Sequence, residues 1–169
     1  MGIAIISDVH NNTVNLKKVL DYCAKEKIET IICCGDLASA ETLDFLNDNY
    51  SGTIYYTFGN MDRDHLNMPA FEHISSYKNT KIYENFGEVE IVGNKIAFIH
   101  YPDKAKDLCE TGKYDFVFCG HTHKPWQETI NNCIILNPGN VAGELYPPTF
   151  AVWETKNDNF ELIRIHELK

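Results

Sequence analysis

The chain has 169 residues, 44% of them hydrophobic and 23% charged, which is enough for one globular domain over residues 1–169 and excludes a disordered chain. Its formal net charge of −9 at pH 7 repels polyanions, so duplex nucleic acid and anionic membrane surfaces are poor candidate partners. An anionic substrate therefore needs local positive charge, and bound metal ions are one source of it.

No segment of the sequence predicts export or insertion into a membrane. The apolar stretch at residues 3–6 is too short for a signal peptide, and no apolar run is long enough to span a bilayer. The six cysteines form no Cys-x-x-Cys pair, and Cys33 and Cys34 are adjacent in a strand-like stretch. We therefore expect buried free thiols and a cytoplasmic protein.

The first half of the chain alternates apolar β-type stretches with amphipathic helices. Strands are expected at residues 2–7, 29–34 and 53–58. Two helices lie between them, one beginning at Thr13 and one over residues 40–49. Their inward faces are predicted from helical spacing to be Leu16, Val19, Leu20 and Cys23 in the first helix, and Leu43, Leu46 and Tyr50 in the second. Strands separated by helices predict parallel βαβ units with right-handed crossovers.

The second half of the chain is expected to be mostly antiparallel. Residues 63–77 are irregular, with short helix at most. Beyond them, the pattern predicts a helix over 102–111, a buried strand over 114–118 and three hairpins. The strands of the first two hairpins are 88–92 with 95–99 around Gly93-Asn94, and 126–130 with 133–136 around Asn131-Asn132. The strands of the third are 150–154 and 160–166. Two sheets packed face to face, with helices outside, would bury both sets of strands.

Side chains with oxygen or nitrogen donor atoms follow five of the expected strands: Asp8 and His10, Asp36, Asn60, His100, and His121 with His123. Ligand sites in parallel α/β sheets lie just beyond the carboxyl ends of the strands, so we expect these groups to converge. Such a set needs a cation, because unpaired carboxylates would repel each other, and its size fits two metal ions. Asp36 is the natural bridge, since a carboxylate can offer one oxygen to each of two ions about 3.5–4 Å apart.

Each member of this set also has an ordinary explanation when it is taken alone. Asp8 could cap the helix that follows it, Asn60 could be a turn residue, and His100 could be a buried core histidine. Coincidence at all five strand ends is a poor explanation for the whole set. Gly120, just before the last pair, is expected to let the chain turn sharply without a Cβ penalty.

The order of these motifs resembles a known family. Its motif set, that of the calcineurin-like metallophosphoesterases, is matched by Asp8-x-His10, Gly35-Asp36, Gly59-Asn60-x-Asp62, His100 and Gly120-His121-x-His123. The compact size and Asn137-Pro138-Gly139 resemble the small single-domain phosphodiesterase branch of that family, and the resemblance covers residues 5–139. It implies an α/β fold, a four-layer αββα sandwich of two mixed β-sheets flanked by helices.

The same resemblance implies a dinuclear metal site, with a metal-bridging hydroxide that attacks phosphorus in line. It assigns Asp8, His10, Asp36 and His123 to one ion and Asp36, Asn60, His100 and His121 to the other. The residues expected to take part in catalysis are Asp36, Asn60, Asp62 and His100. Histidine, carboxylate and amide ligands without thiolate suit Mn²⁺, Ni²⁺, Fe, Co²⁺ or Zn²⁺ better than Ca²⁺ or Cu(I).

Four positions depart from the family pattern. Met61 stands where many members have a histidine that protonates the leaving group, and a thioether has no proton to donate. His65 is near enough in sequence to be considered as a substitute acid. Tyr101 stands where a glycine is common, Asn140 replaces a usual serine, and the arginine often found shortly after that position is missing. These departures concern substrate preference more than metal binding.

The expected function is therefore metal-dependent hydrolysis of a small phosphodiester. The enzymatic alternative is a phosphomonoesterase or a dinucleoside-polyphosphate hydrolase. The non-enzymatic alternative is an interaction scaffold similar to the retromer subunit of the same branch, which ranks lower because that subunit lacks part of the ligand set and all seven positions are filled here. The sequence leaves the oligomeric state open, a homo-oligomer included.

Overall fold

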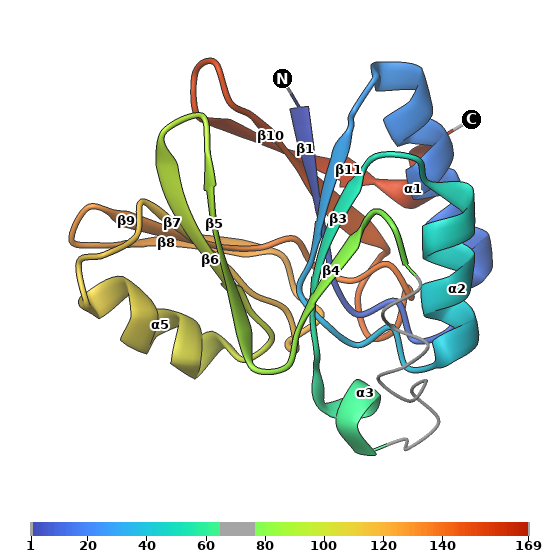
Figure 1. Ribbon diagram of the computed structural model, residues 1–169, viewed down its shortest axis with the longest axis horizontal. Coiled ribbons are helices and arrows are strands. Elements are labelled where there is room, and N and C mark those ends of the chain that lie inside the picture. Colours follow the sequence, from blue (N-terminus) through green and yellow to red (C-terminus); the bar gives the residue numbers. More distant parts are fainter. Residues whose placement is uncertain (1, 65–76, 169) are drawn as a thin grey trace.

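The computed structural model describes residues 2–64 and 77–168, which form two β-sheets packed face to face with helices on the outside (Figure 1). The strands of the first sheet are β1 Gly2–Ile6, β2 Thr30–Cys33, β3 Thr53–Thr57, β4 Thr80–Tyr83, β10 Thr149–Glu154 and β11 Asn159–Arg164, in the order β11-β10-β1-β2-β3-β4. Those of the second sheet are β5 Phe86–Ile91, β6 Asn94–Ile99, β7 Phe116–Phe118, β8 Trp126–Ile130 and β9 Cys133–Asn137, in the order β5-β6-β7-β9-β8.

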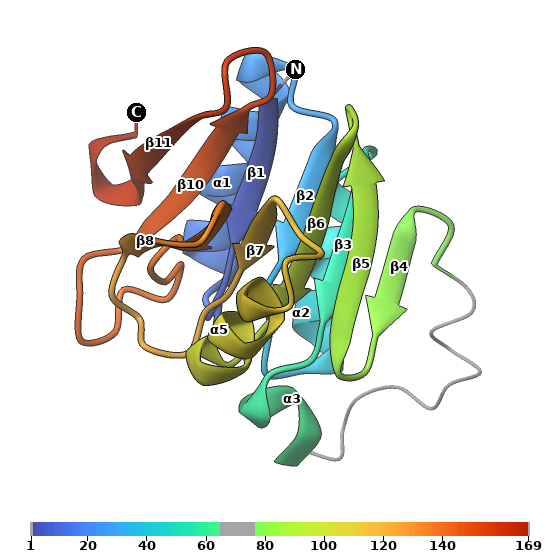
Figure 2. The same ribbon diagram turned by 90° about the vertical axis from the view of Figure 1, so that its left-hand side faces the viewer.

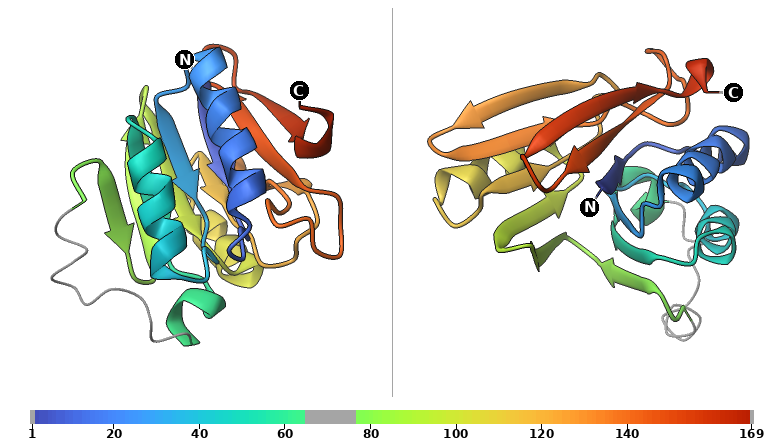
Figure 3. Two further views of the ribbon diagram at one scale, coloured as in Figure 1. Left: turned by 90° about the vertical axis from the view of Figure 1, so that its right-hand side faces the viewer. Right: turned by 90° about the horizontal axis from the view of Figure 1, so that it is seen from above.

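Helices lie on the two outer faces of this pair of sheets and at one end of it. They are α1 Thr13–Glu26, α2 Ala40–Asn49, α3 Asn60–Asp64 and α5 Pro102–Glu110, with a short 3₁₀ helix over Ile165–Glu167. Seen from above, α1 and α2 cover the first sheet and α5 covers the second (Figure 3), whereas α3 lies at one end of the sheets (Figure 1). The arrangement is the four-layer αββα sandwich of two mixed sheets that the sequence predicts.

Three layers of apolar side chains hold these four backbone layers together. Successive residues of a strand face opposite sides of the sheet, so Ala4 and Ile6 pack toward α1 and α2, whereas Ile3 and Ile5 pack between the sheets. A third cluster, which includes Ala105 of α5, fills the space between that helix and the second sheet. The central strands are buried on both faces, which explains their nearly continuous apolar sequence.

The predicted helix boundaries in the first half agree with the structure because local capping defines them. The Asn12 side chain accepts a hydrogen bond from the Asn15 backbone N–H at 3.0 Å, and Ser39 does the same for Thr42 at 3.2 Å. The inward-facing residues predicted for both helices are all buried. The first helix ends at Glu26, and its C-cap Lys27 adopts the left-handed conformation with φ of 56°.

The prediction of a mostly antiparallel second half is wrong for the centre of the second sheet. Strand β7 pairs in parallel with both β6 and β9, because α5 carries the chain from the end of β6 back to the start of β7. The first hairpin also turns one residue earlier than predicted. Ile91 pairs with Asn94, so Val92 and Gly93 are the turn residues and both have positive φ. His65 lies outside the described residues.

The prediction that all six cysteines are free thiols is wrong for two of them. Cys109 of α5 and Cys133 of β9 form a disulfide, with their Cα atoms 5.5 Å apart. They are separated by 24 positions, so only the packing of α5 on the second sheet brings them together. The cysteines therefore give no argument for a reducing compartment.

Within residues 2–64 and 77–168, no helix is both long enough and apolar enough to cross a membrane.

Candidate metal centre

The seven predicted metal ligands meet at one end of the molecule. They follow β1, β2, β3, β6 and β7, and the carboxyl ends of these strands lie at the end where α3 is found (Figure 2). Parallel pairing places these strand ends together within each sheet, and face-to-face packing brings the two sheets' ends side by side. The side chains form two clusters that meet at Asp36.

The first cluster contains Asp8, His10 and His123. The Nε2 atoms of His10 and His123 are 3.2 Å apart, and they lie 3.7 and 3.4 Å from Oδ1 of Asp8. Asp8 is fully buried, and its Oδ2 accepts a hydrogen bond from the backbone N–H of His121 at 3.0 Å. Its Oδ1 accepts no hydrogen bond from the described residues, so this oxygen is free to bind a cation.

The second cluster contains Asn60, His100 and His121. Oδ1 of Asn60 lies 3.1 Å from Nε2 of His100 and 3.0 Å from Nδ1 of His121, and these two nitrogens are 3.2 Å apart. His100 is fully buried, whereas His121 is exposed. The exposed imidazole marks the side of the cluster that solvent or a ligand can reach.

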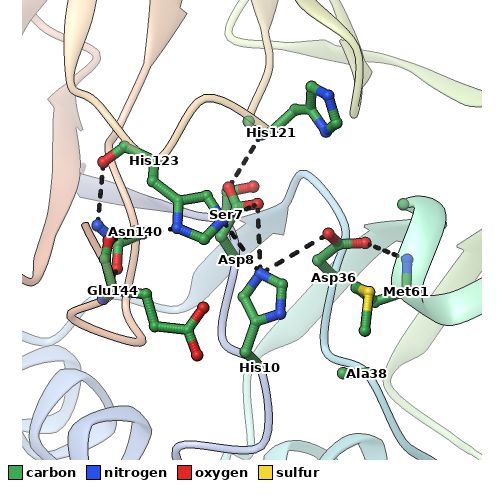
Figure 4. A network of polar contacts seen from close by, with 12 residues as sticks. Ser7, Asp8, His10, Asp36, Ala38, Met61, His121, His123, Asn140 and Glu144 are labelled. Atoms are coloured by element: carbon green, nitrogen blue, oxygen red, sulfur yellow. Dashed lines mark hydrogen bonds and ion pairs between the residues drawn. The ribbon is translucent and has the colours of Figure 1, made fainter. Parts of the chain in front are cut away.

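Asp36 contacts both clusters, and Figure 4 shows its carboxylate between His10 and the backbone of Met61. Its Oδ2 is 3.3 Å from Nε2 of His100 and 3.7 Å from Nε2 of His10. Its Oδ1 accepts a hydrogen bond from the Met61 backbone N–H at 2.8 Å. A single oxygen therefore faces both clusters, rather than one oxygen facing each.

The orientation of two imidazoles fits metal binding. The Nδ1 atoms of His100 and His123 face the backbone carbonyl oxygens of Cys34 at 2.8 Å and of Glu144 at 3.3 Å. A carbonyl only accepts, so each Nδ1 carries a proton, and the Nε2 of each ring, which points at the buried carboxylates, is the atom that would bind a metal ion when the ring is neutral. Histidines that bind metals show this arrangement, with the second ring nitrogen donating to a carbonyl or carboxylate.

The pKa values of Asp8, His100 and His123 are shifted in the direction that favours positive charge, whereas burial and the charge of His100 lower the pKa of His121. Burial raises the pKa of Asp8, but its interactions with His10 and His123 outweigh this effect and leave the pKa well below the usual range. Burial lowers the pKa of His100, whereas the hydrogen bond and charge of Asp36 raise it, and the net pKa is above the ordinary value. The hydrogen bond with Asp8 raises the pKa of His123. Protons and metal ions therefore compete for the same donor atoms.

The Asp62 carboxylate binds backbone N–H groups of the loops that carry the ligands. Its carboxylate accepts hydrogen bonds from the backbone N–H groups of Asp36 at 2.7 Å, Ala38 at 2.8 Å and Gly59 at 2.8 Å. Asp36 and Ala38 both have positive φ, a backbone conformation that needs such support. The geometry makes Asp62 a residue that positions the Asp36 loop.

Gly59 and Gly120 allow the backbone to approach the ligands closely. A Cβ at Gly120 would collide with the Ser7 hydroxyl and approach Oδ2 of Asp8 to 2.7 Å, and one at Gly59 would collide with Oδ1 of Asp36. Gly120 is not among the described glycines with positive φ. Close approach, rather than the sharp turn that we expected, is the reason for glycine at position 120.

The departures from the family pattern lie around the centre. Met61 donates its backbone N–H to the Asp36 carboxylate. The Tyr101 ring packs edge-on against the rings of His100 and His121, with ring centroids 5.1 and 5.2 Å apart. Asn140 is fully buried and donates to the backbone oxygen of His123 at 3.0 Å. The stretch in which the sequence lacks the family's arginine contains Glu144, whose backbone oxygen faces Nδ1 of His123.

The match to known proteins agrees with this geometry. The calcineurin-like phosphoesterase superfamily domain matches residues 1–158, so the chain belongs to that superfamily and is a hydrolytic phosphoesterase. Phosphodiesterase MJ0936 of Methanocaldococcus jannaschii is 30% identical over 166 residues, covering 96% of this chain and 98% of the relative. A solved structure of a novel archaeal phosphodiesterase is similar with a TM-score of 0.85 and 28% identity, covering 97% of this chain and 99% of that one.

The fold is also that of a vacuolar sorting protein. The structure of Vacuolar Protein Sorting 29 from Cryptosporidium parvum is similar with a TM-score of 0.66, covering 96% of this chain and 95% of that one. The identity is 19%, so this likeness concerns the fold alone.

Proposed function

We propose that this protein is a metal-dependent phosphodiesterase that hydrolyses small phosphodiesters at a dinuclear centre. Asp8, His10, Asp36 and His123 would hold one ion, and Asp36, Asn60, His100 and His121 the other. The observation that carries the proposal is the pair of buried carboxylates faced by imidazole Nε2 atoms, with the Asp36 Oδ2 atom 3.3 and 3.7 Å from one imidazole of each cluster. The phosphodiesterase relatives support the choice of reaction.

The donor set favours divalent transition metals. Imidazole, carboxylate and amide oxygen without thiolate suit Mn²⁺, Ni²⁺, Fe, Co²⁺ or Zn²⁺. Two such ions would lower the pKa of a bound water toward neutrality and offset the charge on the phosphoryl oxygens. The protein's own residues fix where this happens: the Cys34 carbonyl orients His100, and Asp62 braces the backbone that carries Asp36.

The residue at position 61 supports a diester rather than a monoester substrate. An alkoxide leaving group needs a proton donor, and a well-placed general acid is typically worth about 10²–10⁴-fold in rate. Met61 has no such proton. Asp62 does not replace it, because its carboxylate accepts three backbone hydrogen bonds and is buried. Substrates with good leaving groups, such as aryl phosphodiesters, are therefore expected to be hydrolysed best.

The test is a substrate panel assayed after the protein has been loaded separately with each of the five metals. We expect about two ions per chain by elemental analysis, and a higher kcat/KM for an aryl diester than for the matched aryl monoester. A preference for the monoester would replace the proposal with the phosphomonoesterase alternative. A protein that binds metal and hydrolyses neither ester nor a dinucleoside polyphosphate would favour the scaffold.

A further inference from the structure

The loop that follows β9 is fixed against the first metal cluster by the buried Asn140 side chain. The Asn140 amide donates to the backbone oxygens of His123 at 3.0 Å and Tyr146 at 3.3 Å. Its Oδ1 accepts from the backbone N–H groups of Gly143 at 2.5 Å and Glu144 at 3.0 Å. One side chain thereby ties residues 143–146 to the backbone of a predicted ligand.

The start of the same loop is tied to the segments that carry Asp8 and His10. The backbone N–H groups of Val141 and Ala142 donate to the carbonyl oxygens of Ser7 at 3.1 Å and Asp8 at 3.0 Å. Asn12 and Asn15, at the start of α1, donate to the carbonyl oxygens of Ala142 and Val141, each at 2.8 Å. The loop is therefore held on both sides, and its position relative to the centre is set by the fold.

Glu144 is the acidic residue that this loop presents. Its backbone oxygen lies 3.3 Å from Nδ1 of His123, and its side chain is exposed. Figure 4 shows the side chain extending from the loop toward His10. Because the loop is held against the first cluster, the Glu144 carboxylate adds negative charge on the side of the centre where His10 and His123 lie.

We propose that Glu144 is a specificity-determining residue, whose negative charge at the rim of the centre selects singly charged phosphodiesters over doubly charged phosphomonoesters. The inference rests on the proposed function and adds a second cause of diester preference. Met61 affects how easily the leaving group departs, whereas Glu144 repels the substrate according to the negative charge of its phosphoryl group. The two causes are separable because only the second depends on ionic strength.

The charge difference between the two substrates is what Glu144 detects. Near pH 8 a monoester carries close to two negative charges and a diester carries one. An exposed charge typically contributes about 0.2–1 kcal/mol to an interaction, which is roughly 1.4- to 5-fold in a rate or binding constant. Replacing Glu144 by glutamine keeps the size of the side chain and removes this effect.

The experiment compares Glu144→Gln with Glu90→Gln, which removes the same charge from an exposed position of β5. Glu90 pairs with Lys95, which lies at the far end of β6, five residues and roughly 16 Å from His100. This control therefore leaves the electrostatic potential at the centre almost unchanged. We expect the diester-to-monoester ratio of kcat/KM to fall about two- to fivefold in Glu144→Gln alone. High salt should change the wild-type ratio more than that of Glu144→Gln, because the variant lacks one of the charges that salt screens.

A binding measurement gives a readout that does not depend on turnover. Titration calorimetry of the metal-loaded proteins at pH 8 with inorganic phosphate and with dimethyl phosphate should show that Glu144→Gln tightens phosphate more than dimethyl phosphate. If both ligands and both esters change by the same factor, the inference is wrong. If the wild type hydrolyses neither ester, the proposed function fails, and the calorimetry still decides whether Glu144 discriminates charge. Elemental analysis must find the same metal content in all three proteins.

Discussion

Most of the predicted ligand residues have an unusual backbone conformation. Five of the seven predicted ligands have positive φ, between 45° and 72°: Asp8, His10, Asp36, His121 and His123. For a residue with a Cβ this conformation costs roughly 1–2 kcal/mol, and it persists only where the surroundings enforce it. The strain is concentrated where side chains leave the strand ends and turn toward one another, which supports a function for this end of the molecule.

Asp36→Asn is expected to abolish activity because it removes the charge shared by both clusters. Changing a residue that only orients a metal ligand already costs about 10–100-fold, so we expect a loss of more than about 100-fold in kcat/KM and of one or both ions. Elemental analysis and the diesterase assay measure the two effects. His166→Ala, at an exposed side chain outside the motifs, should keep both. Two retained ions with normal turnover in the Asp36 variant would refute the bridging role.

Met61→His is expected to raise monoester turnover more than diester turnover. The imidazole could protonate a poor leaving group, which the monoester dianion needs most. Because Asp62 is occupied by backbone N–H groups, it is not free to orient the new ring, so we expect a gain of about tenfold rather than the full effect of a general acid. The measurement is kcat/KM for matched alkyl mono- and diesters. Equal changes in both would show that position 61 does not set the preference.

At the scale of elements, the sequence predicts what local interactions decide and fails where distant packing decides. The bounds of α2 are predicted correctly because Ser39 caps its start, and the β8–β9 hairpin because Asn131 accepts positive φ. The parallel pairing of β7 was missed because the periodicity of hydrophobic residues predicts that a segment is a strand but not which strand it pairs with. The disulfide was missed for the same reason, since no local pattern brings Cys109 to Cys133.

Reduction of the Cys109–Cys133 disulfide is expected to destabilise the metal-free protein. The bond closes a chain segment with a sequence separation of 24, which in the chain-entropy account is worth about 3 kcal/mol, or roughly 6–12 °C in Tm for a protein of this size. Thermal unfolding with and without reductant measures the effect, and a Cys109→Ala/Cys133→Ala double variant should not respond. If thiol titration shows that all six cysteines are reduced and the Tm is unchanged, the prediction is contradicted.

At the scale of the whole molecule, the convergence of the ligands could be predicted because parallel strands share one carboxyl edge. Asp8, Asp36 and Asn60 follow neighbouring parallel strands of the first sheet, and His100 and His121 follow neighbouring parallel strands of the second. The roles of Asp62 and Glu144 could not be predicted, because each depends on a contact between distant loops. The sequence identifies the predicted metal ligands, whereas the fold is needed to identify the residue that positions a ligand and the one proposed to select the substrate.

The global stability of the protein should depend on metal and pH together. In the metal-free protein, the raised pKa values of His100 and His123 contribute stability that is fully present below the ordinary histidine value of 6.5 and is lost as pH rises through the folded-state values. The lowered pKa of Asp8 contributes stability above the ordinary value of 3.8, and this is lost as pH falls through the folded-state value. The metal-free protein should therefore gain most from these groups between about pH 4 and 6.5.

Metal should reverse this dependence, because it binds the deprotonated histidines. The rise in Tm caused by added Mn²⁺ or Zn²⁺ is expected to grow from pH 5 to pH 8, reaching roughly 5–10 °C when the free metal is about 100-fold above its Kd. For the same reason, the acid limb of the pH–rate profile should move to lower pH when excess metal is added. Thermal unfolding across this pH range, with Asp36→Asn as the variant that loses the metal response, measures the coupling. A metal-induced rise in Tm that is the same at pH 5 and pH 8, with an acid limb that ignores added metal, would show that protons and metal do not compete for these histidines.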